Sequence, residues 1–327
     1  MLKLPHRRQF LHLAAGAAAL PVAPRIAMAQ AYPSRPVRIV VPFPAGGTSD
    51  ILARLLGQWI SERLGQPFVI ENRPGAASNV GTEVVVRAPA DGHTLLLVTA
   101  SNMTNSTLYE KLNFNFVRDI APVASINRVS LVMAVTPSFS AKTVSEFIAY
   151  AKANSGKVSM ASAGNGSPGH VSGELFKIMT GVKIVHVPYR GDSPALTDLI
   201  GGQVQVMFGL MPSLIEHIKD GKLRALAVTT ASRSDALPNV PTVSDFVPGF
   251  EASTWQGVGA PKNTPAEIID KLNREINAFL ADPKIKTRIA DFGGTAVSGS
   301  PADFDKVIAE ETEKWGKVIR SANIKAE

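Results

Sequence analysis

The stretch Pro42-Phe43-Pro44-Ala45-Gly46-Gly47-Thr48-Ser49-Asp50 decides how this chain is organised. It follows Val37 to Val41, a β-branched run that predicts a strand ending at Pro42. Apolar residues then recur at helical spacing from Ile51 to Leu64, so the stretch joins a strand to a helix. Thr48, Ser49 and Asp50 offer N-caps for this helix, and Gly65 offers its C-terminal stop.

The small residues of this loop suit the close approach of an anion. Glycines let the backbone come near a ligand, and a helix start presents unpaired N–H groups beside a partial positive charge. An anion there gains about 0.3 to 1 kcal/mol from the helix dipole and roughly 1.5 to 3 kcal/mol from each charge-assisted hydrogen bond. The alternative is a tight turn whose small residues serve only packing.

A second loop, Ala161 to His170, repeats this arrangement. It follows a predicted strand, Val158 to Ser162, and opens a predicted helix that runs to Thr180. Ligands of α/β sheets bind outside the carboxyl ends of the strands, so two such loops facing each other would form a two-sided clamp. We therefore expect both loops to line one site. His170 is expected to contact the ligand or, as the favoured alternative, to cap its helix.

The second loop also carries two enzyme-like patterns. Gly164-x-Gly166-x-x-Gly169 satisfies the dinucleotide fingerprint, with Asp192 following the next strand, although Pro168 in the loop counts against it. Asn165-Gly166-Ser167-Pro168-Gly169 resembles a nucleophile elbow but lacks its first glycine. An exported dinucleotide-dependent enzyme is therefore kept as the alternative function, and no catalytic residue is predicted.

The rest of the chain alternates short apolar runs with helical patterns, which predicts an α/β fold with largely parallel sheets. Leu237 to Gly249, rich in Pro and Gly, is predicted to be irregular surface. The other predicted strands are Phe68–Glu71, Thr94–Thr99, Leu131–Val135, Ile184–Val187, Val204–Phe208 and Leu223–Thr229, and the other helices are Gly81–Arg87, Val144–Ala153, Pro194–Ile200, Pro265–Ala281 and Pro301–Arg320.

Residues 1–29 have the pattern of a cleaved export signal. Lys3, Arg7 and Arg8 form a basic head, an apolar run follows, and Ala27-Met28-Ala29 fits the cleavage pattern. Arg7-Arg8 also fits a twin-arginine signal, with an ordinary secretory signal as the alternative. We therefore expect a periplasmic protein that is cleaved near Ala29.

Composition excludes several function classes. Without residues 1–29, which hold four of the 34 basic residues, 30 basic residues face 27 acidic ones. No basic cluster is interleaved with aromatic residues, which argues against nucleic-acid binding, and no later window is apolar enough to insert into a membrane. Cysteine is absent and the four remaining histidines lack metal-ligand spacing, so neither a metal nor a cofactor is expected.

Several further motifs point to a family. They include Tyr32-Pro33-x-Arg35-Pro36, Glu71-Asn72-Arg73-Pro74-Gly75-Ala76, Ala88-Pro89-x-Asp91-Gly92, Val187-Pro188-Tyr189-x-Gly191, Gly201-Gly202-Gln203-Val204 and Val258-Gly259-x-Pro261. With both loops, these motifs make the chain resemble the substrate-binding receptors of tripartite tricarboxylate transporters, also called Bug-type receptors. The resemblance covers essentially the whole chain after residue 29.

The resemblance implies a non-enzymatic periplasmic type II binding fold, in which two α/β lobes are joined by a two-strand hinge with the ligand cleft between them. Residues 30–130 and 255–327 would form the first lobe and residues 131–254 the second. A small organic carboxylate would be held between the lobes and delivered to the membrane subunits of a tripartite transporter. The expected ligand-binding residues are Phe43, Ala45, Gly46, Gly47, Thr48, Ser101, Ser162, Gly164, Asn165, Gly166, Ser167, His170 and Asp192.

Two positions depart from the family pattern. Many relatives carry glycine where this chain has Asp192, and aspartate where it has Gly209. Asp192 precedes Ser193-Pro194, so it is expected either to cap the helix that begins there or to face the cleft and select the ligand.

Overall fold

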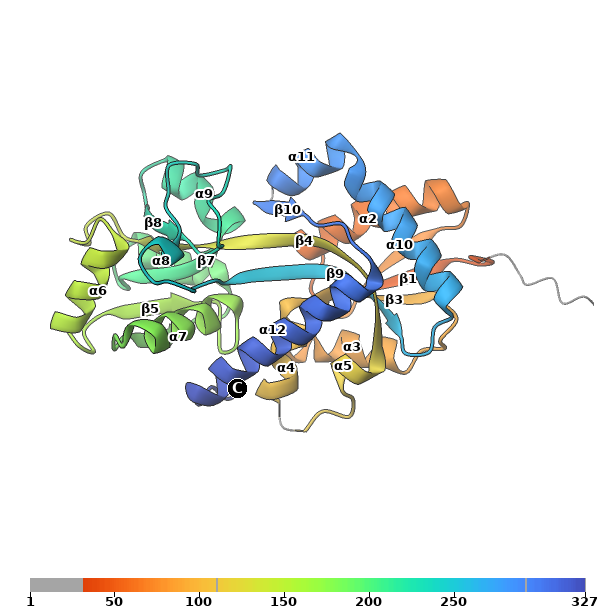
Figure 1. The fold of residues 1–327 in the computed structure, drawn as a ribbon, viewed down its shortest axis with the longest axis horizontal. Coiled ribbons are helices and arrows are strands. Elements are labelled where there is room, and N and C mark those ends of the chain that lie inside the picture. Colours follow the sequence, from red (N-terminus) through yellow and green to blue (C-terminus); the bar gives the residue numbers. More distant parts are fainter. Residues whose placement is uncertain (1–31, 110, 292, 327) are drawn as a thin grey trace, which may run out of the picture.

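The computed structural model describes residues 32–109, 111–291 and 293–326, in which helices and strands alternate (Figure 1). The first half of the chain contains β1 (Val37–Val41), α2 (Thr48–Leu64), β2 (Phe68–Asn72), η1 (Ala76–Ser78), α3 (Asn79–Val86), β3 (Thr94–Thr99), α4 (Ala100–Leu108), α5 (Phe116–Asp119), β4 (Ile120–Val135), α6 (Val144–Ala153) and β5 (Ser159–Ser162). The second half contains α7 (Pro168–Thr180), β6 (Val185–Pro188), α8 (Asp192–Ile200), β7 (Val206–Leu210), α9 (Met211–Lys219), β8 (Arg224–Val228), η2 (Val243–Asp245), β9 (Ser253–Pro261), α10 (Ala266–Ala281), α11 (Pro283–Asp291), β10 (Gly294–Ala296) and α12 (Pro301–Ser321).

The strands form a sheet in the order β2-β1-β3-β9-β4-β7-β5-β6, and β8 and β10 also pair with β4. β1 is parallel to β2 and β3, and β5 is parallel to β6 and β7. β9 is antiparallel to both β3 and β4. The predicted parallel pairing therefore holds within each half of the sheet, and antiparallel strands join the two halves.

The α/β architecture has two lobes, and β4 and β9 run between them (Figure 1). β4 pairs with β9 from Ile120 to Ser130, and then with β7 and β8 from Leu131 to Val135. A strand that changes its partners in this way can bend where the change occurs. The predicted lobe boundaries after residues 130 and 254 lie beside this region and stay predictions.

Apolar burial divides between the lobes, but α12 contributes to both. In the first lobe, β1, β3, α2 and α10 enclose a core that includes Ile39, Leu56 and Ile276. In the second, Phe147, Phe176 and Phe208 are fully buried in another core. Trp315, Val318 and Ile319 from the end of α12 belong to this second core, although the sequence placed the helix in the first lobe. The helix therefore spans the two lobes beside the hinge strands.

The structure differs from the sequence predictions at several places in the fold: β4 begins at Ile120 rather than Leu131, and α5, α9, α11, β9 and β10 were not predicted. The prediction of surface for residues 237–249 is wrong in part, because Val243 and Val247 are buried around the short helix η2. Helix α4 was not predicted, because its buried face is polar and gives no apolar stripe. Asn102 donates to Thr82 Oγ1 (2.7 Å) and Asn105 to the carbonyl of Ala77 (2.6 Å), which satisfies these side chains inside the fold.

Candidate functional site

The first loop leads into helix α2, and no side chain caps the backbone N–H groups at the start of that helix. The N-cap of α2 is Gly47, and no side chain caps the helix, so the predicted capping role of Thr48, Ser49 and Asp50 is wrong. The first backbone bond into α2 runs from Ile51 N–H to the carbonyl of Gly47 (3.0 Å). The preceding N–H groups, which include those of Thr48 and Ser49, have no acceptor within the helix. This helix start therefore offers several donors to an anion.

Asp50 stands close to these donors, but its charge is engaged. The side chain is 3 % exposed and accepts hydrogen bonds from Arg54 through both oxygens (3.0 Å each), from Gly46 N–H (2.9 Å) and from Asn72 Nδ2 (3.0 Å). The Arg54 hydrogen bonds, with smaller help from Gly46 and Asn72, lower the pKa of Asp50 to about 2. The carboxylate is therefore ionised and paired, and it holds the loop without leaving an uncompensated negative charge.

The remaining residues of the first loop are placed by these bonds. Ala45, Gly46 and Gly47 are exposed, and Gly46 has a φ of +86°, which favours glycine. Asn72 Nδ2 also donates to the carbonyl of Phe43 (3.0 Å), which ties the loop to β2. Ser49 accepts from Gln256 Nε2 (2.7 Å), so the start of α2 is fixed to the hinge strand β9.

The second loop is finished differently. Ser167 is the N-cap of α7 and accepts from His170 N–H (3.4 Å), so the predicted capping role of His170 is wrong. Instead, His170 Nδ1 accepts from Gly166 N–H (3.1 Å). Ser162 is fully buried, and its Oγ accepts from Gly164 N–H (3.2 Å) and lies 2.6 Å from His186 Nε2. Most donors of this loop are therefore used inside the protein.

His186 is a residue of this region that the sequence predictions missed. Its ring stacks on that of His170 with centroids 3.6 Å apart and planes 10° apart. Burial, with a smaller contribution from His170, lowers the pKa of His186 to about 4. No local motif marks the residue, because it lies on the neighbouring strand β6, 24 positions after Ser162. Only the pairing of β5 with β6 brings the two together.

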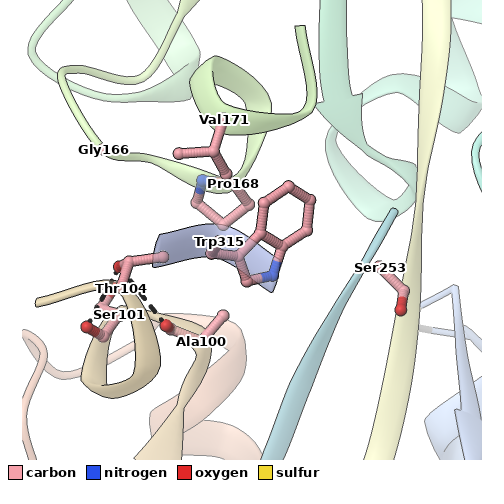
Figure 2. Close-up of a pocket in the computed structure, with 8 residues that line it drawn as sticks. All are labelled: Ala100, Ser101, Thr104, Gly166, Pro168, Val171, Ser253 and Trp315. Carbon is pink, nitrogen blue, oxygen red and sulfur yellow. Dashed lines mark hydrogen bonds between the residues drawn. The ribbon is translucent and has the colours of Figure 1, made fainter. Parts of the chain in front are cut away.

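A small cavity lies where the lobes meet, and its volume is about 10 Å³ (Figure 2). Two predicted site residues line it, Ser101 from α4 and Gly166 from the second loop. The other lining residues, none of them predicted, are Ala100, Thr104, Pro168, Val171, Ser253 and Trp315. Such a volume holds roughly one water molecule. A carboxylate therefore cannot enter this cavity unless the lobes move apart.

Leu108 of α4 lies against Gly166 of the second loop. A Cβ atom added to Gly166 would lie 2.4 Å from Leu108 Cδ2, so a larger residue there requires the Leu108 side chain to move. The first loop is absent from the cavity lining that the structure describes. The structure thus brings Ser101 and Gly166 together at the cavity, whereas Phe43 and Ala45 to Thr48 do not line it.

The two departures from the family pattern have different structural contexts. Asp192 is the first residue of α8, whose N-cap is Gly191 without a side-chain bond, so the predicted cap role is wrong. Gly191 N–H donates to the carbonyl of Ala163 (3.2 Å), which places Asp192 beside the second loop. Burial raises the pKa of Asp192. At Gly209, a Cβ atom would lie 2.7 Å from Leu214 Cδ1, so a larger residue there requires the Leu214 side chain on α9 to move.

Within the three described segments, no group of histidine, cysteine and acidic side chains is arranged to hold a metal ion. Over the same residues, no helix is both long and apolar enough to cross a membrane. The predicted export signal lies outside the residues that the structure describes.

Comparisons with known proteins agree with this architecture. The family model described as Tripartite tricarboxylate transporter family receptor matches residues 52–324. BugT of Bordetella pertussis is 38% identical over 300 residues, which cover 91% of this chain and 92% of that protein. The structure of R. palustris Rpa4515 with adipate is 39% identical, with a TM-score of 0.80, and the match covers 90% of this chain and 99% of that one.

A more distant neighbour has the same fold. MatC (Rpa3494) from Rhodopseudomonas palustris, with bound malate, is 31% identical with a TM-score of 0.75, over 88% of this chain and 100% of that one. The matches span nearly the full length of each relative, and these neighbours are solute-binding proteins. This chain therefore belongs to the tripartite tricarboxylate transporter receptor family, and it is a solute-binding receptor of the two-lobed periplasmic type rather than an enzyme.

Proposed function

We propose that this receptor captures a small organic carboxylate between its lobes and delivers it to the membrane subunits of a tripartite transporter. The observation that carries the proposal is the uncapped start of α2, whose free N–H groups stand at the carboxyl end of β1. Backbone N–H groups at a helix start bind anions through hydrogen bonds and through the helix dipole. Because Arg54 neutralises Asp50, the loop's own acid does not oppose an incoming carboxylate.

Closure of the lobes would complete the site. Carboxylates bound at α2 would gain donors from the second loop when β4 and β9 bend. Asn165 is the loop residue best placed for this role, because the neighbouring glycine N–H groups are already bonded. The residues expected at the ligand are therefore Gly47, Thr48 and Asn165, with Ser101 at the meeting of the lobes. Ser162 holds the loop in place, because its Oγ accepts a hydrogen bond from Gly164 N–H.

The ligand class follows from the relatives. Adipate is bound in one neighbour and malate in another, so small dicarboxylates are the first candidates for this chain. Export by residues 1–29 to the periplasm would place the receptor where such a transporter takes up its solute. No comparison supports the alternative of a dinucleotide-dependent enzyme. Leu108 also lies against Gly166, in the space where the fingerprint would require a pyrophosphate to approach.

Titration calorimetry tests the proposal. Purified protein, freed of bound small molecules by unfolding and refolding, is titrated with adipate, malate, succinate, an amino acid and an uncharged diol of similar length. We expect at least one carboxylate to bind and the diol to give no heat. Mass spectrometry of the molecules released on unfolding identifies what the protein carried. Binding of the diol as tightly as the acids would contradict carboxylate recognition.

A further inference from the structure

The imidazole rings of His170 and His186 stack on each other and contact the second loop. His170 comes from α7 and His186 from β6, and each ring has a nitrogen within hydrogen-bonding distance of a group in residues 162–166. We infer that His170 and His186 are positioning residues, which hold the Ser162 hydroxyl and the Gly166 N–H inward so that the loop presents Asn165 N–H to a bound carboxylate. This inference rests on the proposed function and adds to it how the second loop acquires its shape.

The hydrogen bond from Gly166 selects the tautomer of a neutral His170 ring. Its Nδ1 accepts from Gly166 N–H (3.1 Å), so this nitrogen carries no proton. The proton of the neutral ring is then on Nε2, which lies 3.7 Å from Glu174 Oε1. Glu174 also accepts from Lys177 Nζ (2.7 Å), so its charge is shared with a cation on the same helix.

Burial favours the neutral form of His186. Its pKa is lowered to about 4, first because the ring is buried and then because His170 lies against it. Ser162 Oγ lies 2.6 Å from His186 Nε2 and 3.2 Å from the carbonyl of Gly164, so its single proton is donated either to Nε2 or, when Nε2 carries the ring proton, to that carbonyl. The Ser162 oxygen is then available to accept from Gly164 N–H (3.2 Å). The charged groups that face the pair are Glu174 and Lys177, both on α7, and the neighbouring Leu108 of α4 is apolar.

These bonds determine which backbone donor remains. Gly164 N–H goes to Ser162, Gly166 N–H to His170, and Ser167 N–H to the carbonyl of Gly164 (3.2 Å). In the part of the chain that the structure describes, Asn165 N–H donates to no protein group. Gly164 and Gly166 have φ values of +129° and +72°, so the backbone turns on both sides of Asn165. The imidazoles thereby direct the two flanking N–H groups inward and leave the central one free.

Hydrogen exchange of single amides tests the inference on the whole protein without any ligand. His186→Phe keeps the stacked ring and removes the nitrogen that bonds Ser162, whereas His186→Gln restores a polar group. In His186→Phe we expect exchange at Gly164 and Gly166 to accelerate about tenfold, as for the loss of one net hydrogen bond, with Gly46 unchanged. His186→Gln should recover part of the protection. His217→Gln on α9, away from the loop, is the matched control.

Nitrogen NMR of the imidazoles gives a second readout. We expect His170 to carry its proton on Nε2, and His186 to stay neutral down to about pH 4. Unchanged exchange at Gly164 and Gly166 in His186→Phe, or a His170 ring protonated on Nδ1, would overturn the inference. Affinity for adipate, measured for the wild type and His186→Phe, should fall about tenfold in the variant. If the wild type binds no carboxylate, the proposed function fails, while the exchange data still decide how the loop is held.

Discussion

The two ligand loops have similar sequences, but the hydrogen bonding of their backbone N–H groups is opposite. Both follow a strand, contain glycines and open a helix. Helix α2 has no side-chain cap, and Asp50 in its first turn is paired with Arg54. Helix α7 is capped by Ser167, and the N–H groups of Gly164 and Gly166 in its loop are bonded to Ser162 and His170. The same local sequence pattern can therefore give either a loop whose N–H groups are free for a ligand or a loop whose shape is fixed by internal hydrogen bonds. We assign anion attraction mainly to the first loop and shape mainly to the second.

Asp50→Ala should have the largest effect, because it removes four hydrogen bonds at once and leaves Arg54 without its partner. We expect the free energy of unfolding to fall by about 3 kcal/mol and carboxylate binding to be lost, since the first loop would no longer be held. Denaturant unfolding and calorimetry measure both effects. Asp270→Ala, an exposed acid on α10, is the control. Wild-type affinity in Asp50→Ala would contradict the assignment of anion attraction to the first loop.

Glycine-to-alanine changes compare the loops directly. Gly46→Ala meets no atom within 4 Å and bears only the strain of its positive φ, whereas Gly166→Ala also meets Leu108 at 2.4 Å. We expect losses in unfolding free energy of about 1 kcal/mol for Gly46→Ala and about 3 kcal/mol for Gly166→Ala. Adding Leu108→Ala to Gly166→Ala should recover the steric part of the loss. Equal losses for the two single variants would show that the lobe contact seen at Gly166 does not persist in solution.

Acid should weaken the two loops in different pH ranges. The pKa of His186 is lowered from 6.5 to about 4, so the unfolded chain binds its proton first, and stability present above pH 6.5 is lost as the pH falls towards 4. The pKa of Asp50 is lowered from 3.8 to about 2, so the stability that it contributes is lost only as the pH falls from 3.8 to about 2. We expect His186 to contribute about 2 kcal/mol to the free energy of unfolding, less than the full shift implies, because solvent screens this half-buried ring. Between pH 7 and pH 4, the melting temperature should decline less in His186→Gln than in the wild type. An equal decline in both proteins would contradict the assignment of this acid sensitivity to His186.

Asp192 should give the smallest effect, on ligand choice rather than on stability. An ionised carboxylate beside the second loop would repel the second acid of a dicarboxylate, and burial already raises the pKa of Asp192. In Asp192→Gly we expect adipate and malate to bind about threefold more tightly relative to an amino acid, for a repulsion near 0.7 kcal/mol. Calorimetry with the same ligand panel measures this ranking. An unchanged ranking would remove Asp192 from ligand selection.

The sequence alone determined the α/β architecture, the two strand–loop–helix units and the family, because these depend on local periodicity, turn chemistry and short motifs. It also gave α10 and α12 nearly to their ends, since both have clear apolar stripes and α12 begins with a capping Ser300. Helix α4 was not predicted, because its buried Asn102 and Asn105 donate to residues that are distant in the sequence, Thr82 and Ala77.

Only the tertiary structure decided how each loop is completed. The sequence predicted that Asp50 caps the helix. Instead, its carboxylate oxygens accept hydrogen bonds from Gly46, Arg54 and Asn72, and Asn72 is 22 positions away. His186 carried no local signal, because strand pairing alone places it against Ser162. Leu108 likewise reaches Gly166 only through the approach of the two lobes. A local pattern specifies which donors a loop possesses, and long-range contacts determine which of them remain free for a ligand.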